Sequence, residues 1–220
     1  MRTISRLGRA LTMAALLPAA AMAQQASKSI DNSWYWGAGG GRISFPTVIH
    51  RVDAPMISAD WLITRQRWAL QVYGSQAYFT DTSTAPDPNV SGVRKVVMTD
   101  LRRVGFQGIV FLPNWTWFRP YAGVGYSFNF INKARPVGVA AIPTPLDSAA
   151  IARTNDARAR AKGTATAGFM VTWRDFAPYA QYTVMPTKGT GAWLINGEGF
   201  TSFWEVGLRY RFGTSIEKLK

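Results

Sequence analysis

Apolar and polar side chains alternate with period two along much of this chain, a spacing that puts alternate residues on opposite faces of a β-strand. The clearest case is the segment 119–131. One of its faces carries Ala122, Val124, Tyr126, Phe128 and Phe130, and the other carries Tyr121, Gly123, Gly125, Ser127 and Asn129. Comparable alternation occurs in 34–41, 57–64, 68–75, 164–173 and 204–212, and less regularly in 98–112 and 177–185. The pattern predicts about eight strands and an all-β fold.

The polar face of these strands carries charge as well as small side chains. A soluble barrel buries its apolar face, whereas a transmembrane barrel turns that face to lipid and keeps small and polar side chains in its lumen. Charged residues make a poor soluble core, because burying them costs free energy. We therefore predict a transmembrane antiparallel up-and-down β-barrel.

Eight strands enclose an interior that side chains can fill, so we expect the barrel not to conduct like a porin. The last strand returns beside the first, where Gly37 and Gly39 would leave room for long guanidinium groups. Buried arginines need counter-charges or hydrogen-bond acceptors. The pattern therefore predicts a lumen polar network of Asp60, Glu205, Arg209 and Arg211.

The connections between the expected strands alternate in length. Those near 65–66, 114–115 and 174–175 are short, whereas those at about 44–54, 80–95, 132–162 and 186–199 are long and rich in Pro, Gly, Asp, Ser and Thr. Such alternation is typical of outer-membrane barrels, with turns in the periplasm and loops outside.

The longest connection, 132–162, is basic, and its part 150–161 is compatible with a short helix. Its charged residues are Lys133, Arg135, Arg153, Arg158, Arg160 and Lys162, with Asp147 and Asp156 as the acids. Two interpretations stay open: contact with lipopolysaccharide phosphates or an external ligand, and an ordinary solvated loop.

Tryptophan gathers at one end of the predicted strands. Of the 9 in the chain, those at the short-turn ends are Trp34, Trp36, Trp61, Trp68, Trp115, Trp117 and Trp173. An indole ring favours the membrane interface, where the ring is half apolar and its N–H stays hydrated. We interpret these residues as a periplasmic aromatic girdle.

The N-terminus has the features of a secretory signal. Arg2, Arg6 and Arg9 precede an apolar stretch over 10–21, and Ala21 and Ala23 supply the small side chains of a cleavage site. We expect three parts: a signal peptide (1–23), an outer-membrane barrel (24–212) and a polar periplasmic tail (213–220). The expected location is the outer membrane of a Gram-negative bacterium.

Charge and composition narrow the classes of partner. The chain carries 25 Lys and Arg against 12 Asp and Glu, and no cysteine, so disulfides and thiol chemistry are excluded. Export argues against nucleic acid, and the basic residues do not form a stripe with interleaved aromatics. Anionic outer-membrane lipids, lipopolysaccharide above all, are the partners that better fit the expected location.

The last strand carries a more specific pattern. Glu205, Gly207, Tyr210 and Phe212 match the spacing of the terminal signal in small outer-membrane barrels, and with it the chain resembles the eight-stranded proteins grouped around OmpA, OmpX and OmpW. The resemblance implies that the barrel assembly machinery reads these residues as an assembly signal. Members of that family usually stop at the final aromatic residue, whereas this chain continues to residue 220.

Candidate chemistry is sparse. The single histidine, His50, together with Asp81 and Ser83, is a conceivable acyl-transfer set like that of outer-membrane enzymes that act on lipid A. A solvated loop histidine is the alternative that we favour, and no metal or cofactor motif is present. We expect a non-enzymatic barrel with a structural or interaction role, lipopolysaccharide-contacting loops and a lumen filled by side chains. The alternatives are a narrow channel for small or hydrophobic solutes and a lipid A-modifying enzyme.

Overall fold

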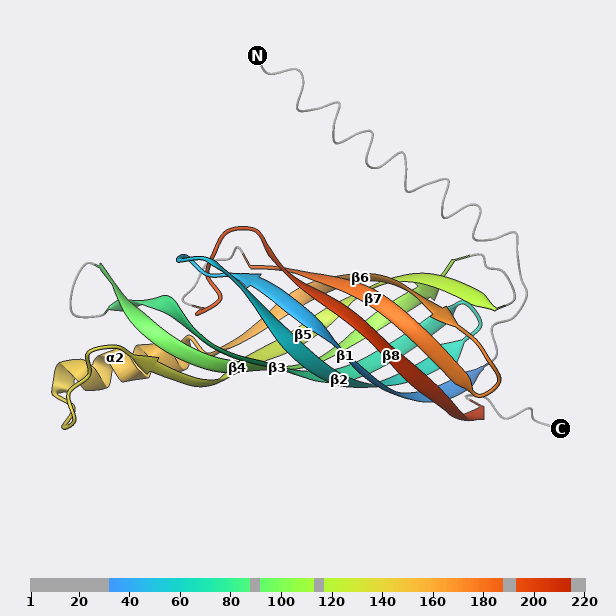
Figure 1. Cartoon of the computed structure of the whole chain (residues 1–220), viewed down its shortest axis with the longest axis horizontal. Coiled ribbons are helices and arrows are strands. Elements are labelled where there is room, and N and C mark those ends of the chain that lie inside the picture. Colours follow the sequence, from blue (N-terminus) through green and yellow to red (C-terminus); the bar gives the residue numbers. More distant parts are fainter. Residues whose placement is uncertain (1–31, 88–91, 113–116, 188–192, 215–220) are drawn as a thin grey trace, which may run out of the picture.

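The computed structural model describes residues 32–87, 92–112, 117–187 and 193–214. These residues form one closed barrel in which every strand pairs with the next and β1 pairs with β8 (Figure 1). The elements are β1 (Ser33–Pro46), β2 (Arg51–Arg65), β3 (Trp68–Asp87), β4 (Gly92–Phe111), β5 (Phe118–Pro136), α2 (Pro145–Asp156), β6 (Ala159–Val171), β7 (Phe176–Pro186) and β8 (Phe200–Thr214). All pairs are antiparallel. The predicted fold class is confirmed.

Some sequence predictions lie outside the described residues. They are the signal peptide 1–23 with Ala21 and Ala23, the girdle residue Trp115, and positions 215–220 of the tail. Within the described part of the chain, no helix has the length and apolar character needed to cross a bilayer.

The strands face as the period-two pattern predicts, with apolar side chains outward and polar ones inward. On β8, Val206 is 61% exposed, whereas Glu205 is 4% and Arg209 0% exposed. The register between the ends of the sheet sets Gly37 opposite Arg209 and Tyr35 opposite Arg211. At the level of these residues the barrel is therefore inverted relative to a soluble one, because apolar side chains face outward while Asp60, Glu205 and Arg209 lie buried inside.

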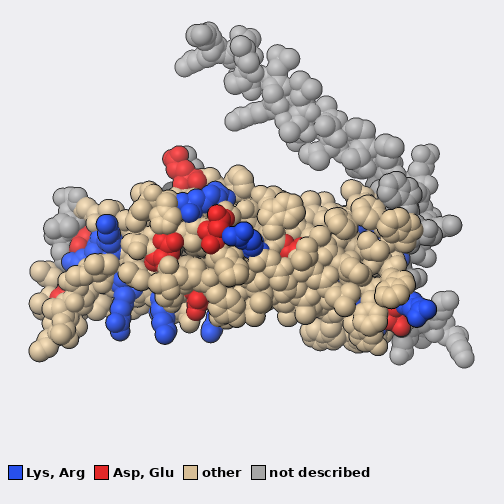
Figure 2. Space-filling view, in the orientation of Figure 1, with Lys and Arg blue, Asp and Glu red and all other residues tan. Residues whose placement is uncertain are grey.

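The outward apolar residues form a band around the barrel. On β8 the band runs from Trp204 to Phe212, which at about 3.3 Å per residue and a tilt of about 40° covers roughly 20–25 Å along the barrel axis. That height is close to the apolar band of outer-membrane barrels, about 25 Å. Figure 2 shows most charged side chains over the half of the molecule that carries α2, and few over the other half. We call these two ends the α2 end and the turn end.

The connections at the α2 end differ from the prediction. β1 and β2 are joined by residues 47–50 alone, and β3 and β4 stay paired out to Asp87 and Gly92. The predicted loops 44–54 and 80–95 are therefore mostly strand. Their polar composition reflects exposure to water beyond the apolar band, where an antiparallel ladder forms equally well.

Helix α2 starts at Pro145 rather than near residue 150. Thr144 caps it: its hydroxyl accepts from the backbone N–H of Asp147 at 3.2 Å, while its backbone N–H donates to the Asp147 carboxylate at 3.2 Å. This capping box satisfies two otherwise unpaired N–H groups. The helix predicted over 150–161 therefore lies about one turn earlier in the chain. As a consequence, Arg158 and Arg160 lie beyond its end.

Candidate functional site

The lumen is filled in three layers along the barrel axis. Near the turn end lies an apolar layer: Tyr35, Leu62, Ala69, Ile109, Phe111, Tyr121, Met170, Ala177 and Tyr179. Near the α2 end lies a larger apolar cluster that includes Ile43, Phe45, Met98, Leu101, Ile131, Met185, Phe203 and Trp193 to Ile195. Polar side chains that hydrogen-bond to one another lie between the two.

An ion pair holds the centre of the polar layer. Arg209 Nε donates to Asp60 Oδ2 at 2.8 Å, and Nη2 lies 2.8 Å from the same oxygen. Gln71 Nε2 donates to that carboxylate at 2.7 Å, and the guanidinium lies 3.9 Å from the centre of the Tyr179 ring. Gly37 makes the space, because a Cβ there would lie 1.8 Å from Asp60 Oδ1 and 2.9 Å from Arg209 Cγ.

Neutral donors hold Glu205, the second lumen carboxylate. Its Oε1 accepts from the hydroxyls of Ser58 and Tyr179, each at 2.6 Å, and its Oε2 accepts from Gln181 Nε2 at 3.0 Å. The Tyr179 ring thus lies between the Arg209 guanidinium and this carboxylate. Gly39 leaves room for the Tyr179 hydroxyl, since a Cβ would lie 2.6 Å from it. The predicted role of Gly39, space for a guanidinium, is corrected.

The polar layer continues around the barrel through uncharged side chains. Gln107 Nε2 donates to Gln71 Oε1 at 2.5 Å, and Gln107 Oε1 accepts from Thr166 at 2.8 Å. Thr166 also lies 2.8 Å from the Thr183 hydroxyl. These bonds connect β3, β4, β6 and β7, so the layer crosses the lumen instead of lining one wall.

Arg103 is a further buried lumen arginine, outside the predicted polar network. Its guanidinium lies 3.7 Å from the Phe203 ring centre and 4.7 Å from that of Tyr73, and its Nε donates to Ser75 at 3.2 Å. The period-two pattern breaks at Asp100, which has a φ of 52°. From Leu101 to Phe111 the alternation is regular, and it puts Arg103 inward.

Arg211 lies at the turn-end mouth. Its Nη2 donates to Asp175 Oδ1 at 2.8 Å, and the two side chains are 36% and 55% exposed. Asp175 belongs to the β6–β7 turn, which reaches the end of β8. The prediction that Arg211 belongs to the same network as Asp60 and Glu205 is therefore corrected. Arg211 lies on the same face of β8 as Arg209, but it pairs with Asp175 at the rim of the barrel.

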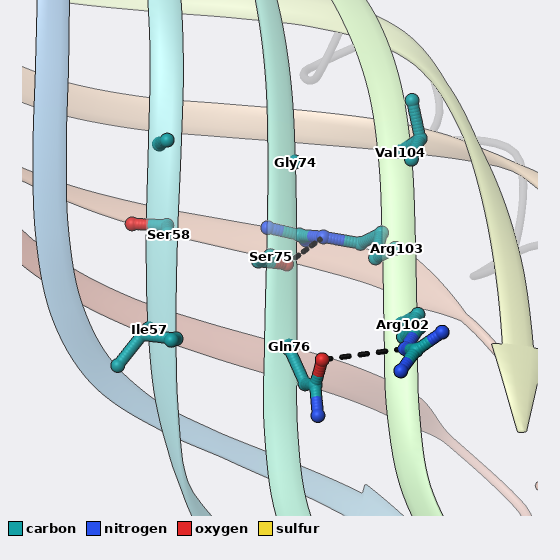
Figure 3. A pocket seen from close by; sticks show the side chains of 9 residues that line it. Ile57, Ser58, Gly74, Ser75, Gln76, Arg102, Arg103 and Val104 are labelled. Atoms are coloured by element: carbon teal, nitrogen blue, oxygen red, sulfur yellow. Dashed lines mark hydrogen bonds between the residues drawn. The ribbon is translucent and has the colours of Figure 1, made fainter. Parts of the chain in front are cut away.

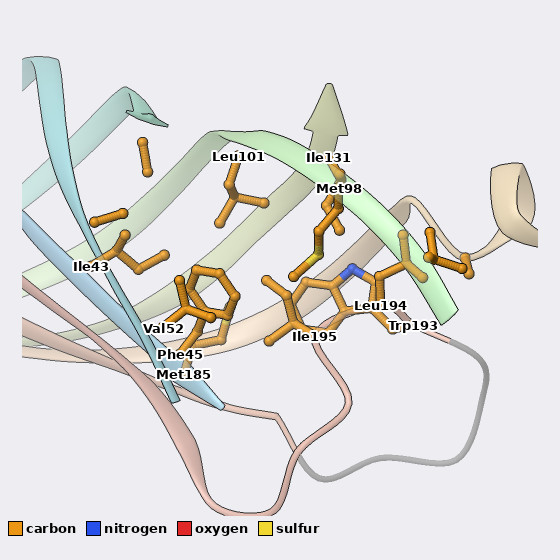
Figure 4. Close-up of a cluster of buried hydrophobic side chains, with 14 of the residues drawn as sticks. Ile43, Phe45, Val52, Met98, Leu101, Ile131, Met185, Trp193, Leu194 and Ile195 are labelled. Atoms are coloured by element: carbon orange, nitrogen blue, oxygen red, sulfur yellow. The ribbon is translucent and has the colours of Figure 1, made fainter. Parts of the chain in front are cut away.

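Residues Trp193, Leu194 and Ile195 close the α2 end of the lumen. They are 3%, 0% and 0% exposed and pack among the apolar side chains of the strands (Figure 4). The Leu194 N–H donates to the Ala157 carbonyl at 3.2 Å, and its own carbonyl accepts from the Ser83 hydroxyl. We call this segment the plug. The polar composition of 186–199 predicts an outer loop, although its three consecutive large apolar residues are a signal for burial.

Asn196 fastens the plug to two hairpins. Its Nδ2 donates to the Thr84 carbonyl at 2.7 Å, and its Oδ1 accepts from the Val48 N–H at 3.2 Å. The next residue, Gly197, donates its N–H to the Pro46 carbonyl at 3.1 Å. The plug is thus bonded to the β1–β2 and β3–β4 hairpins as well as packed.

The structure brings together part of the candidate acyl-transfer set. His50 Nε2 lies 3.1 Å from Asp81 Oδ2, and the histidine side chain is 48% exposed. Ser83 is buried and donates to the Leu194 carbonyl, so its hydroxyl belongs to the plug. A nucleophile must lie within hydrogen-bond reach of its base, and here the serine is engaged elsewhere. Among the described residues, no three His, Asp or Glu side chains gather as a metal site would require.

The basic residues of 132–162 divide into two groups. Arg158 donates to the carbonyls of Ile131 and Asn132, and Lys162 lies 5.8 Å from the ring centre of Trp193. The side chains of these two residues are thus engaged in contacts within the α2 end of the protein. The exposed members are Lys133, Arg135, Arg153 and Arg160.

Asp147, an acid of this segment, is occupied by the helix cap and by Arg94, whose Nη1 lies 3.4 Å away. Hydrogen bonds from Thr144, its backbone N–H foremost, hold the pKa of Asp147 below its ordinary value.

The described tryptophans of the predicted girdle lie at the turn end, whereas Trp204, also outward, lies toward the α2 end of β8. Trp61 lies 5.3 Å from Trp34 and 5.7 Å from Trp36 between ring centres, and Phe212 lies 6.0 Å from each of those two indoles. The other described members of the predicted girdle are exposed: Trp68 (64%), Trp117 (58%) and Trp173 (64%). Phe212, a residue of the assembly motif, is thus part of the same aromatic surface.

No protein-family model matches the chain, and no curated protein matches its sequence. Solved structures do resemble it. Neisserial surface protein A has a TM-score of 0.55 at 11% identity, covering 81% of this chain and 97% of that one. Ail of Yersinia pestis, in complex with the heparin analogue sucrose octasulfate, has a TM-score of 0.50 at 12% identity, covering 83% and 100%. The chain has the fold of small eight-stranded outer-membrane barrels, as the sequence predicted.

Proposed function

We propose that this protein is an integral outer-membrane barrel that is closed inside and acts through its outer surface, in contact with lipopolysaccharide and external partners. The observation that carries the proposal is the filled lumen. The Asp60–Arg209 layer and the plug are two separate barriers in series. A barrel whose lumen is blocked at two levels is suited to holding outer loops at the cell surface rather than to transport.

The outward surface supports the membrane part of the proposal. Its apolar band has the height of the outer-membrane hydrocarbon layer. Indoles at the turn end suit the periplasmic interface, and Lys133 and Arg135 at the α2 end suit anionic headgroups. In this orientation α2 and its hairpins extend outside the cell.

Export and assembly follow from the same proposal. The signal 1–23 would be removed at Ala23, and the barrel assembly machinery would read Glu205, Gly207, Tyr210 and Phe212. Tyr210 and Phe212 are 49% and 44% exposed on the outward face, where another protein can contact them. Gly207 also has an internal role, because a Cβ there would lie 2.6 Å from the Tyr179 ring.

The alternative functions make different predictions. A narrow channel needs a continuous path, and both barriers would have to open. A lipid A-modifying enzyme needs a nucleophile, and the engagement of Ser83 by the plug speaks against that set. Mass spectrometry of lipid A from cells with and without the gene tests the enzyme: an unchanged profile is expected, and a gene-dependent change in acylation would support it.

Single-channel recording in planar bilayers tests the proposal directly. The purified, folded protein should show little or no steady conductance. A double variant, Arg209→Ala with Leu194→Ala, removes a member of each barrier and should raise the conductance or lower the stability, whereas Arg211→Ala at the exposed rim should do neither. A large, stable, ohmic conductance from the unmodified protein would reject the closed barrel and favour the channel.

A further inference from the structure

The outward face of β2, β3 and β4 is hollowed into a groove. Two adjoining hollows of about 420 Å³ and 280 Å³ share Ala59, Gly74 and Val104. One extends to Gln76 and Arg102 on the α2 side, and its walls are shown in Figure 3. The other extends toward the turn end and is lined by Trp36, Trp61 and Val72. We call the two together the β3 groove.

Gly74 forms the floor of the β3 groove, and nothing inside the protein requires a glycine there. A Cβ on Gly74 would meet no atom closer than the Arg103 carbonyl oxygen at 3.9 Å. At Gly37, by contrast, a Cβ would clash with the Asp60 carboxylate at 1.8 Å. A glycine within a strand weakens it and often marks a close approach by a ligand or another chain. The space above Gly74 therefore points outward, to a molecule that lies against the barrel.

The walls of the groove suit a hydrocarbon chain. Ile57 and Val104 flank the floor from the neighbouring strands and are 55% and 53% exposed. The groove runs from the α2 side of the apolar band toward the turn end, as a lipid chain does within one leaflet. Burial of its methylene groups against these walls would stabilise a bound chain.

The α2 end of the groove is cationic. Arg102 Nε donates to Gln76 Oε1 at 3.3 Å, which orients the guanidinium at the mouth of the groove (Figure 3). Within the described part of the chain, no other protein group hydrogen-bonds to it. Lys133 and Arg135 on β5 face outward farther along, opposite Thr99 and Val97. The nearest acid along the strand is Asp100, at the β4 bulge. Guanidinium groups bind phosphate by paired, charge-assisted hydrogen bonds.

We propose that the β3 groove is a binding site for lipid A, with one acyl chain over Gly74 and a phosphate on Arg102. The inference deepens the proposed function and rests on its orientation, in which Arg102 lies at the interface of the outer leaflet. Lys133 and Arg135 continue the positive surface away from the hydrocarbon, where the phosphorylated sugars of lipid A extend. These residues thus provide one contact surface for an acyl chain, over Gly74, and one contact for a phosphate, at Arg102.

Native mass spectrometry of the folded protein in detergent, titrated with diphosphoryl lipid A, tests the site. We expect one lipid A retained per barrel. Gly74→Leu, which fills the groove without an internal clash at Cβ, and Arg102→Gln, which removes one charge-assisted contact, should each weaken retention about tenfold. The matched controls are Gly108→Leu, on an outward glycine with no atom within 4 Å of its Cβ, and Arg42→Gln on β1. Both should leave retention within about twofold of the unmodified protein.

Two outcomes would overturn the site. Equal retention by the Gly74→Leu variant would show that no chain lies in the groove, and equal retention of phosphatidylglycerol would show that lipid A is not its ligand. Failure of the proposed function looks different, because the unmodified protein would then conduct in planar bilayers, or would not give the heat-sensitive gel mobility of a folded barrel in vesicles. The same gel assay confirms that each variant is folded before lipid is added.

Discussion

Replacing Arg209 by methionine should cost far more stability than the same change at Arg211, two residues along the same strand. Both arginines pair with an aspartate at 2.8 Å. Arg209 and Asp60 are 0% and 1% exposed, whereas Arg211 and Asp175 are 36% and 55% exposed. The two variants therefore remove the same chemical group from a buried and from a solvated ion pair.

The expected magnitudes follow from this difference in burial. Arg209→Met leaves the Asp60 carboxylate with Gln71 as its described donor and removes the cation over the Tyr179 ring. Breaking a buried pair by removing one partner costs about 3–5 kcal/mol, because an uncompensated charge stays buried. An exposed pair contributes about 1 kcal/mol or less, since water and salt screen it.

Urea titration of the folded protein in lipid vesicles, followed by tryptophan fluorescence, measures both free energies of unfolding. Adding Asp60→Asn to the Arg209→Met variant should recover a large part of the loss, because it removes the uncompensated charge. Equal losses at positions 209 and 211 would refute the buried network, and so would a double variant whose loss is the sum of the two single losses.

Three further predictions concern other parts of the molecule. Leu194→Ala should destabilise the barrel by about 3 kcal/mol in the same titration, since Leu194 is fully buried in the plug; a loss below about 1 kcal/mol would mean that the plug is not packed. Because the pKa of Asp147 is lowered, α2 should keep its protection from hydrogen exchange above the ordinary pKa near 3.8 and lose it as the pH falls through the lowered value. Asp147→Asn should abolish that dependence, and a transition near pH 6 would contradict it. Phe212→Ala should reduce the amount of folded barrel in outer-membrane fractions, whereas deletion of 215–220 should not; the reverse result would move the assembly signal elsewhere.

The strand pattern and the inside–outside assignment could be predicted from sequence because both depend on period-two alternation. The position of Arg209 beside Gly37 followed from closure of the barrel, since the last strand must meet the first. Such inferences need no knowledge of side-chain contacts. They therefore succeeded where the alternation is regular.

The missed features depend on contacts between distant segments. Arg103 has an inward position in β4, but its place over the Phe203 and Tyr73 rings follows only from closure of the barrel. The plug depends on burial against strands far away in the chain, and local polarity around it indicates a loop. Arg211 has the same parity as Arg209, and only the position of the β6–β7 turn puts Asp175 within its reach. The helix start was readable in Thr144 and Asp147 but was outweighed by the alanine-rich stretch after them.

The orientation of the barrel in a membrane is tested most directly by one matched pair of substitutions, Val206→Arg and Val93→Arg. Both valines face outward, and they are similarly exposed, at 61% and 67%. Val206 lies within the apolar band, whereas Val93 lies beyond it, beside Arg94 and Lys95. In vesicles, Val206→Arg should lower the free energy of unfolding by about 2–4 kcal/mol and Val93→Arg by less than about 1 kcal/mol. Equal, small effects at the two positions would contradict a barrel whose apolar band faces lipid.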